Sequence, residues 1–288
     1  MAGYKQRLAY FCWSLRNAGD ASRSTCPSCG DSSSQTVARK KLFSALRRCN
    51  ACRLLFRTPT TNATENASFY QSEYEQGGAT DVPSDTALSA LLASRFEGTD
   101  LDRSDSIRLL RAVGYGVGAR IFDFGCSWGY GSWQFQQAGF DVSAYEISRP
   151  RSNFAVEKLG VQMAAPSSIE PQSFDVVYSS HVIEHVPSPA KMLAQGMHIL
   201  RPGGLFVALT PNGSLNYRRA NAKSWQSSWG QVHPQLICEE WVKRAAGDRP
   251  YYISGLPADL SALSRWSDEQ QIDGDLRQPH LFFAIRNC

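Results

Sequence analysis

One segment, RIFDFGCSWGYG from Arg120 to Gly131, constrains the fold of this chain more than any other. It begins with a short apolar, β-prone run that contains one acid, Asp123, as in a strand buried within a parallel sheet. A turn with Gly125 and Gly129 follows, and glycine lets the backbone turn sharply and approach a ligand closely. Helix-compatible residues come next, so the free N–H groups of a helix start would face the same crevice. The segment therefore predicts an α/β sheet that holds a nucleoside-type cofactor.

A second acid follows at a distance that suits ribose binding. Glu146 lies 23 residues after Asp123 and ends another apolar run, Phe140 to Tyr145. At the end of a neighbouring strand, its carboxylate can accept hydrogen bonds from both hydroxyls of a ribose. A dinucleotide-dependent dehydrogenase is disfavoured because the turn lacks the spacing Gly-x-Gly-x-x-Gly.

Two further motifs follow in order. They are FDVVYSSHVIEHV, Phe174 to Val186, and LRPGGLFVALTPNG, Leu200 to Gly213. Together with the turn and Glu146 they resemble the class I S-adenosylmethionine-dependent methyltransferases, with Ser127 in place of the middle glycine of the first motif. The resemblance implies S-adenosylmethionine as cofactor and a Rossmann-like α/β fold with a seven-stranded sheet whose last strand is antiparallel. The alternative is a doubly wound domain that binds another nucleotide or none.

The resemblance also names candidate residues for the cofactor. They lie in the glycine turn, after the second strand and at the end of the fourth: Asp123, Gly125, Cys126, Ser127, Gly129, Glu146, Ile147 and Ser180. Family members commonly place a further acid near the adenine, but this chain has none at the expected position, so Ser167, Ser168 and Ile169 could contact the adenine instead. Tyr70 and Tyr74 lie i, i+4 on a predicted helix, where they could face the cofactor or pack as an ordinary aromatic pair.

Four of the eight cysteines form the sharpest metal signal in the chain. Cys26 and Cys29 make one Cys-x2-Cys knuckle, and Cys49 and Cys52 make a second knuckle after a gap of 19 residues. Two such knuckles supply the four thiolates of one structural, tetrahedral zinc ion. The spacing therefore predicts a small zinc ribbon; paired reduced thiols without metal are the alternative.

Charge and motifs divide the chain into four parts. Residues 1–60 carry 11 Lys and Arg against 2 Asp and Glu, whereas residues 61–104 carry 2 against 8. The predicted parts are a helical extension (1–22), the zinc ribbon (23–60), a helical connecting segment (61–104) and the methyltransferase domain (105–288). A basic ribbon could bind RNA, but no run of basic residues interleaved with aromatics supports nucleic-acid binding. We expect the ribbon to pack on the catalytic domain.

The segment His181-Val-Ile-Glu184-His185 carries the candidate catalytic bases. It matches the H-x-x-E-H pattern of inverted zinc peptidases, but it follows a strand, and two prolines interrupt the chain soon after it. In methyltransferases this loop lies beside the transferred methyl group, so His181 is the first candidate base, with His185 and Glu184 next. Loop capping and core hydrogen bonding are the alternative roles.

The same loop raises the question of a divalent ion. The ubiquinone-pathway O-methyltransferases have a similar acid-x-x-Glu-His arrangement that can bind such an ion. His181 replaces the first acid in this chain, which disfavours Mg²⁺.

Residues 212–236 are too long for a simple connection between the fifth strand and the next helix, and we expect them to form a lid. Trp225 and Trp229 could stack on a sugar face or close an apolar pocket, with nearby basic residues on a phosphate or carboxylate. His233 in this segment is a further candidate base. The alternative is that the tryptophans pack beneath hydrated surface charge.

The arrangement of the chain, with a four-cysteine ribbon before these motifs, resembles bacterial methyltransferases of sugar, polysaccharide and natural-product pathways. It implies methyl transfer to oxygen or carbon of a small-molecule or saccharide acceptor, by in-line displacement with a histidine general base. An RNA methyltransferase and a non-catalytic binding protein are the alternatives. No stretch reaches the ~18 consecutive apolar residues of a membrane span, so we expect a cytoplasmic protein without membrane insertion. The sequence leaves the acceptor and the oligomeric state open.

Overall fold

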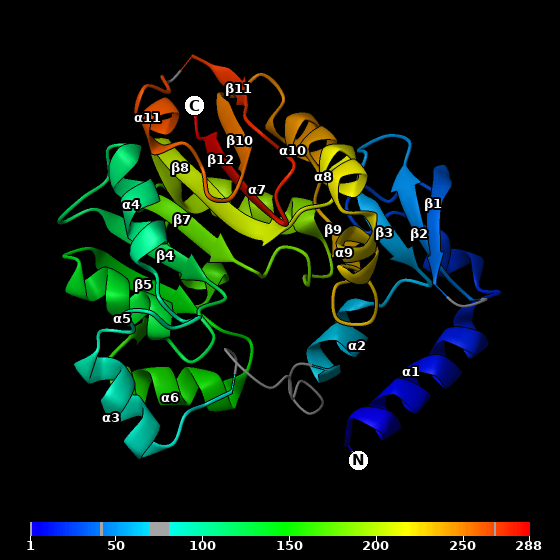
Figure 1. Cartoon of the computed structure of the whole chain (residues 1–288), viewed down its shortest axis with the longest axis horizontal. Helices are drawn as coiled ribbons and strands as arrows, with labels where there is room; N and C mark the ends of the chain where they lie inside the picture. The colour runs from blue at the N-terminus through cyan, green and yellow to red at the C-terminus, as the bar shows by residue number, and fades with distance from the viewer. Residues whose placement is uncertain (1, 41–42, 70–80, 268) are drawn as a thin grey trace.

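The structure is a computed structural model that describes residues 2–40, 43–69, 81–267 and 269–288, with side chains from residue 9 onward. It contains a small sheet and a large sheet, which lie side by side in Figure 1. In the described part of the chain, no helix is long and apolar enough to span a lipid bilayer.

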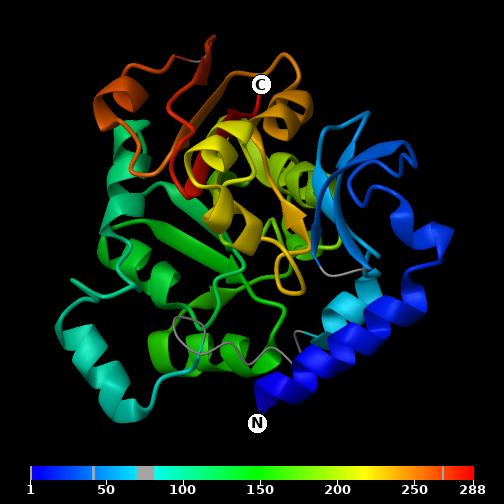
Figure 2. The ribbon, with the colours of Figure 1, turned by 45° about the vertical axis from the view of Figure 1, so that its right-hand side comes forward.

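The small sheet is antiparallel and holds the cysteine region. Its strands, in spatial order, are β1 (Ser34–Lys40), β2 (Ser44–Cys49), β3 (Leu55–Thr58) and β9 (Gln235–Leu236). The fourth strand comes from a distant part of the sequence, because Leu55 of β3 pairs with Leu236 of β9. Helix α1 (Ala2–Asn17) and the short helices η1 (Ala21–Ser24) and α2 (Ala63–Ser68) flank this sheet, and α1 runs beside α2 in Figure 2.

Within the described residues, the large sheet has eight strands instead of the seven expected. In spatial order they are β11 (Gln271–Asp273), β10 (Tyr251–Gly255), β12 (His280–Arg286), β8 (Leu200–Pro211), β7 (Phe174–Ser180), β4 (Arg120–Phe124), β5 (Asp141–Tyr145) and β6 (Gln162–Met163). The additional strand is β11, a short edge strand that pairs parallel to β10. The last strand, β12, is antiparallel to both of its neighbours, as expected. The parallel strands β4, β5 and β7 end at one edge of the sheet, where the site residues gather.

Helices cover both faces of the large sheet because its strands are apolar on both sides. Ile121 and Phe122 of β4 belong to the cores of opposite faces. One face carries α4 (Ser104–Ala112), α5 (Tyr130–Gln137) and α11 (Leu260–Ser264), and the other carries α7 (Pro189–Ile199) and α10 (Glu239–Ala246). The remaining helices are α3 (Asp85–Ala93) and α6 (Arg149–Leu159) near β5, the short η3 (Pro166–Ser168), and α8 (Leu215–Ala220) and α9 (Ala222–Ser227) in the linker before β9.

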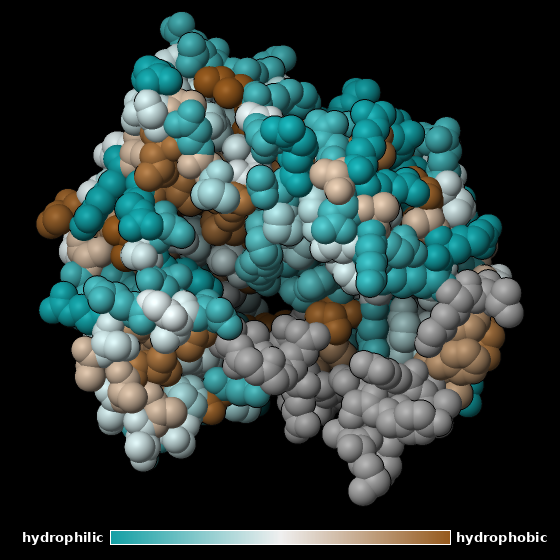
Figure 3. Space-filling view, viewed as in Figure 1, coloured by the Kyte–Doolittle hydropathy of each residue, from teal (hydrophilic) through white to brown (hydrophobic). Residues whose placement is uncertain are grey.

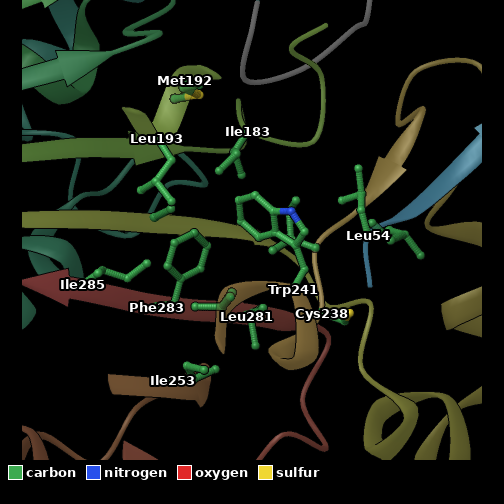
Figure 4. Packing of buried hydrophobic residues seen from close by; sticks show 14 of the residues in the cluster. Leu54, Ile183, Met192, Leu193, Cys238, Trp241, Ile253, Leu281, Phe283 and Ile285 are labelled. Atoms are coloured by element: carbon green, nitrogen blue, oxygen red, sulfur yellow. The ribbon is translucent and has the colours of Figure 1, made fainter. Parts of the chain in front are cut away.

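One hydrophobic core joins the two sheets. Leu54, which precedes β3, belongs to the same buried cluster as Trp241 of α10 and Phe283 of β12. In Figure 4 the indole of Trp241 lies between Leu54 on one side and Ile183 and Phe283 on the other. Its Nε1 donates a hydrogen bond to Ser28 Oγ at 3.1 Å. The cysteine region is therefore packed onto the large sheet through buried apolar surface.

Candidate active site

The turn after β4 needs glycine at two positions. Gly125 and Gly129 have φ values of 88° and 86°, in the left-handed region. A Cβ on Gly125 would lie 2.4 Å from a methyl group of Val182, and a Cβ on Gly129 would lie 2.8 Å from Cβ of Ala155. The turn therefore brings the end of β4 into close contact with the HVIEH loop and with α6.

Glu146 closes the same turn from the end of β5. Its Oε2 accepts a hydrogen bond from the backbone N–H of Ser127 at 2.9 Å, and its Oε1 accepts one from the N–H of Ser148 at 2.8 Å. Burial raises the pKa of this carboxyl, and the bond from Ser148 opposes that rise. Each carboxylate oxygen keeps a second lone pair, so Glu146 can still accept hydrogen bonds from a diol.

Asp123 lies beneath the turn. It is 4% exposed and accepts a hydrogen bond from Ser132 Oγ at 2.6 Å. Burial raises the pKa of its carboxyl to about 6, although the bond from Ser132 and the charge of Arg103 act in the opposite direction. Arg103 donates to the hydroxyl of Tyr130 at 2.6 Å, so a partly buried arginine and a tyrosine lie beside the acid.

A single cavity of about 1070 Å³ runs along this edge of the large sheet. Figure 3 shows the surface hollowed between the two halves of the molecule. The predicted residues that line the cavity are Gly125, Ser127, Glu146, Ile147, Ser180, His181, His185 and His233. Four predicted cofactor residues and one candidate base do not line it: Asp123, Cys126, Gly129, Ser168 and Glu184.

On the side expected to face the adenine, Ser167 lines the cavity, whereas Ser168 and Ile169 do not. The Oγ of Ser168 instead donates a hydrogen bond to the carbonyl of Ala165 at 2.8 Å. Tyr70 and Tyr74 lie outside the described residues.

The cavity also contains residues that sequence reasoning missed. Arg103, Tyr130, Tyr145, Lys191 and His280 are among them. One of them carried a signal: β12 is antiparallel, so its first residue, His280, lies at the same edge as the last residues of the parallel strands. Arg103 had no comparable signal, because it directly precedes a helix with no recognisable motif.

His181 and Glu184 form the centre of a polar cluster at the far end of the cavity. Nδ1 of His181 lies 3.3 Å from Oε1 of Glu184, whose other oxygen accepts a hydrogen bond from Thr210 Oγ1 at 3.0 Å. The side chain of His181 is 43% exposed, whereas that of Glu184 is fully buried. His181 also has a φ of 56°, and its N–H donates to the carbonyl of Leu209 at 2.7 Å. An accessible imidazole is thus held against a buried carboxylate.

Burial and the neighbouring groups shift the pKa values in this cluster. Burial acts to raise the pKa of the Glu184 carboxyl, but the hydrogen bond with His181 and the charges of the nearby histidines together outweigh it and hold this pKa at about 2. Burial lowers the pKa of His185 to about 4, against the opposing effect of Glu184. At neutral pH, Glu184 is therefore an anion and His185 is a neutral imidazole.

Two other histidines of the cluster, His185 and His233, are oriented by backbone carbonyls. Nδ1 of His185 lies 2.7 Å from the carbonyl of Val232, and Nδ1 of His233 lies 2.9 Å from the carbonyl of Ser228. A carbonyl accepts, so each Nδ1 carries a proton, and Nε2 is the nitrogen left to face a ligand. Ligand atoms of Glu184, His185 and His233 all lie within 4.8 Å of one another. Two imidazoles and one carboxylate suit a transition-metal ion better than Mg²⁺, which prefers oxygen ligands.

The four cysteines of the small sheet converge as the spacing predicted. Their Sγ atoms lie within 4.8 Å of one another, with 3.5 Å between Cys26 and Cys52 and between Cys29 and Cys49. A tetrahedral ion with Zn–S bonds of about 2.3 Å requires sulfur atoms about 3.8 Å apart, which is close to these distances. Pro27, inside the first knuckle, lines the large cavity. The cysteine region therefore forms part of the wall of that cavity.

The linker at 212–236 packs against the small sheet. Trp225 and Trp229 are 1% and 2% exposed, so they are buried, which agrees with the alternative of packed tryptophans and contradicts stacking on a sugar. The guanidinium of Arg218 lies 4.6 Å from the ring centroid of Trp225, and its Nη2 donates to the carbonyl of Val37 in β1 at 3.3 Å. His233, further along the linker, is the residue that reaches the large cavity.

Comparison with known proteins identifies the family. Residues 90–246 match a family described as a methyltransferase domain, which is more than half of the chain. The chain belongs to this family and carries an S-adenosylmethionine-dependent methyltransferase domain, with a four-cysteine cluster on an N-terminal antiparallel sheet.

Two curated relatives share the same name, ubiquinone biosynthesis O-methyltransferase. The protein of Roseobacter denitrificans is 35% identical over 166 residues, which are 54% of this chain and 62% of that protein. The protein of Ralstonia nicotianae is 32% identical over 98 residues, which are 31% of this chain and 41% of that protein. The chain thus spans less than two thirds of the length of each of these relatives.

Solved structures include more distant matches. A geranyl diphosphate methyltransferase in complex with GPP and sinefungin is 14% identical, with a TM-score of 0.49 over 78% of this chain and 99% of that chain. A possible histamine N-methyltransferase from Thermotoga maritima is 13% identical, with a TM-score of 0.45 over 70% of this chain and 95% of that chain. These values carry no information about the acceptor.

Proposed function

We propose that this protein transfers a methyl group from S-adenosylmethionine to an oxygen or carbon atom of a small-molecule or saccharide acceptor. One observation carries the proposal: the glycine turn with Glu146 and the cluster around His181 line the same cavity. The cofactor and a base would then meet in one space, as an in-line displacement requires. The two curated relatives named as O-methyltransferases support an acceptor of this size.

We assign the cofactor to the end of the cavity at β4 and β5. Glu146 would accept hydrogen bonds from the ribose hydroxyls, and the backbone at Gly125 and Ser127 would lie against the cofactor. Gly129, Cys126 and the buried Asp123 would act from behind the turn, by holding its shape. Ile147, Ser180 and the serines at 167 and 168 would complete the nucleoside side.

We assign proton removal to His181. S-adenosylmethionine supplies an electrophilic methyl group when bound. An acceptor hydroxyl or carbon acid gives its proton to the accessible imidazole of His181, while Glu184 stabilises the imidazolium that forms. His185 is buried and neutral, so its role would be to position Glu184 and the loop at Val232; His233 is the alternative base from the linker.

We propose that the four cysteines hold one structural zinc ion. The donor set is four thiols in two knuckles, and the distances between their sulfur atoms suit a tetrahedral site.

We propose the same division of the chain into an extension (1–22), a ribbon (23–60), a connecting segment (61–104) and a methyltransferase domain (105–288), with one change to the boundary of the ribbon. The linker supplies β9 to the ribbon sheet, so the two modules share a strand.

A transfer assay with labelled cofactor tests the function. Sugar nucleotides, glycans, phenols and RNA are offered in separate reactions, and label is expected in a phenol or saccharide fraction. Label in RNA alone would favour the alternative that the basic ribbon binds RNA. Binding of the cofactor without transfer to any acceptor would favour a binding protein that keeps the fold.

A further inference from the structure

A second cavity, of about 500 Å³, lies outside the catalytic cavity. Its walls come from α1, β3, α2 and the end of the linker, and include Tyr10, Trp13, Arg57, Glu65, Asn66 and Val232. Figure 2 shows α1 and α2 side by side at this edge of the molecule. None of the predicted site residues lies in the described part of its lining.

Arg57 is the unusual residue in this cavity, because its guanidinium is buried and two of its three nitrogens lack a hydrogen-bond partner in the described part of the chain. The residue is 1% exposed, and its Nη1 donates a hydrogen bond to the hydroxyl of Tyr10 at 2.9 Å. Its Nε and Nη2 are buried and have no hydrogen-bond partner in the described part of the chain. These two nitrogens share one edge of the planar guanidinium, and that edge can bind both oxygens of a carboxylate.

The other charged residue of the lining, Glu65, is already paired. Its Oε2 accepts a hydrogen bond from Arg23 Nη1 at 2.8 Å, and its Oε1 accepts bonds from Arg23 Nη2 at 2.9 Å and Trp13 Nε1 at 3.1 Å. No carboxylate of the described chain forms an ion pair with Arg57 within 4.0 Å. A buried charge without a counter-ion is unfavourable, and an anionic ligand would remove this cost.

Aromatic rings beside Arg57 indicate which apolar group such a ligand would carry. The guanidinium carbon of Arg57 lies 5.2 Å from the ring centroid of Tyr10 and 5.4 Å from that of Trp13. The two rings are stacked, with centroids 6.1 Å apart and planes 17° apart. Nε and Nη2 are buried, so a ligand that reaches them has to displace neighbouring side chains. Flat apolar walls beside a free guanidinium edge suit an aromatic ring that carries a carboxylate.

We propose that this cavity is a binding site for a small aromatic carboxylate. The carboxylate bridges Nε and Nη2 of Arg57, and the ring of the ligand packs against Tyr10 and Trp13. The site adjoins the catalytic cluster: Asn66 lines both cavities and donates a hydrogen bond to the carbonyl of His185 at 2.8 Å. The carbonyl of Val232, on the wall of the second cavity, lies 2.7 Å from Nδ1 of His185.

Calorimetry of the full chain with benzoate tests the proposal, with benzyl alcohol as the neutral ligand of similar shape. Arg57→Gln removes the charge, and Arg57→Lys keeps the charge but loses the planar fork. Arg53→Gln is the matched control, because Arg53 belongs to the same module, pairs with Glu240 and does not line the cavity. Thermal melting of every variant shows whether it is folded.

We expect benzoate to bind the wild type and Arg53→Gln equally, at least tenfold more weakly to Arg57→Gln, and more weakly to Arg57→Lys than to the wild type. If Arg57→Gln does not fold, the comparison with Arg57→Lys decides. Equal binding of benzoate by the wild type and the Arg57 variants would overturn the proposal, as would equal binding of benzyl alcohol or no binding at millimolar benzoate. Tighter binding of phenyl phosphate than of benzoate would overturn the assignment of the ligand as a carboxylate.

Discussion

Gly125 shows how one residue joins the glycine turn after β4 to the loop that carries His181. The lack of a Cβ leaves room for Val182, and the φ of 88° disfavours any other residue. We expect Gly125→Ala to lower the free energy of unfolding by about 1–3 kcal/mol and to weaken binding of S-adenosylmethionine. Gly116→Ala is the control, because a Cβ on Gly116 would meet no atom within 4 Å. Chemical denaturation and calorimetry measure both effects; equal stability of the two variants would contradict this view of the turn.

His181 is the residue on which the proposed chemistry depends. We expect His181→Ala to lower kcat by about 10²–10⁴-fold, since a positioned general base contributes that much, with little change in the Kd of S-adenosylmethionine. His198→Ala serves as the control, because His198 lies on α7 and outside the cavity. Steady-state kinetics with an identified acceptor measures this effect. Equal turnover by the two variants would exclude His181 as the base.

The lowered pKa of His185 predicts how the free energy of unfolding depends on pH. Its pKa is about 4 in the folded protein, below the 6.5 that is usual for histidine in an unfolded chain, so the unfolded chain binds the proton first as the pH falls. Stability should therefore decrease from pH 6.5 to pH 4, by at most about 3 kcal/mol from this residue. In His185→Gln this part of the decrease should be absent. Urea denaturation at pH 7 and at about pH 4.5 checks it, and identical pH dependence in both proteins would contradict the assignment.

At the scale of elements, we expect the stability of the cysteine sheet to depend on the proposed zinc ion. We expect one zinc ion per purified chain, and a lower Tm after treatment with a strong chelator, because binding of a structural metal contributes directly to the stability of the fold around it. The double variant Cys26→Ser, Cys49→Ser should lose the ion. Cys12→Ser, Cys288→Ser is the control, since both of these cysteines are exposed and outside the cluster. One zinc ion retained in the knuckle variant would refute the ribbon site.

The elements also show what the sequence could predict. The strands around Asp123, Glu146 and Ser180 were predictable, because short apolar runs bounded by turns have a clear local signal. The pairing of β9 with β3 was not, because two residues carry no periodic pattern and the partner lies far away in the chain. Trp225 and Trp229 are buried in the linker that this pairing holds against the small sheet. The sequence alone therefore could not distinguish a lid from a packed linker.

At the scale of the whole molecule, the two modules form one packed unit. Trp241 is 1% exposed and touches groups from both sides of the junction. We expect a single unfolding transition in the wild type, and in Trp241→Ala a loss of about 3–5 kcal/mol of stability with a transition that splits or broadens. Calorimetric melting measures both, and two separate transitions in the wild type would contradict a shared core.

The candidate site was only partly predictable from the sequence, because Pro27, Arg103 and His280 come together through tertiary packing.

The central claim is that the turn and Glu146 hold S-adenosylmethionine in the cavity that also contains His181. Isothermal titration calorimetry of the full chain with this cofactor tests it most directly. We expect one site per chain with a micromolar Kd, weakened at least tenfold in Glu146→Ala and unchanged in Glu157→Ala, whose side chain lies on α6 outside the cavity. No binding at micromolar cofactor, or equal binding by Glu146→Ala and the wild type, would contradict the claim.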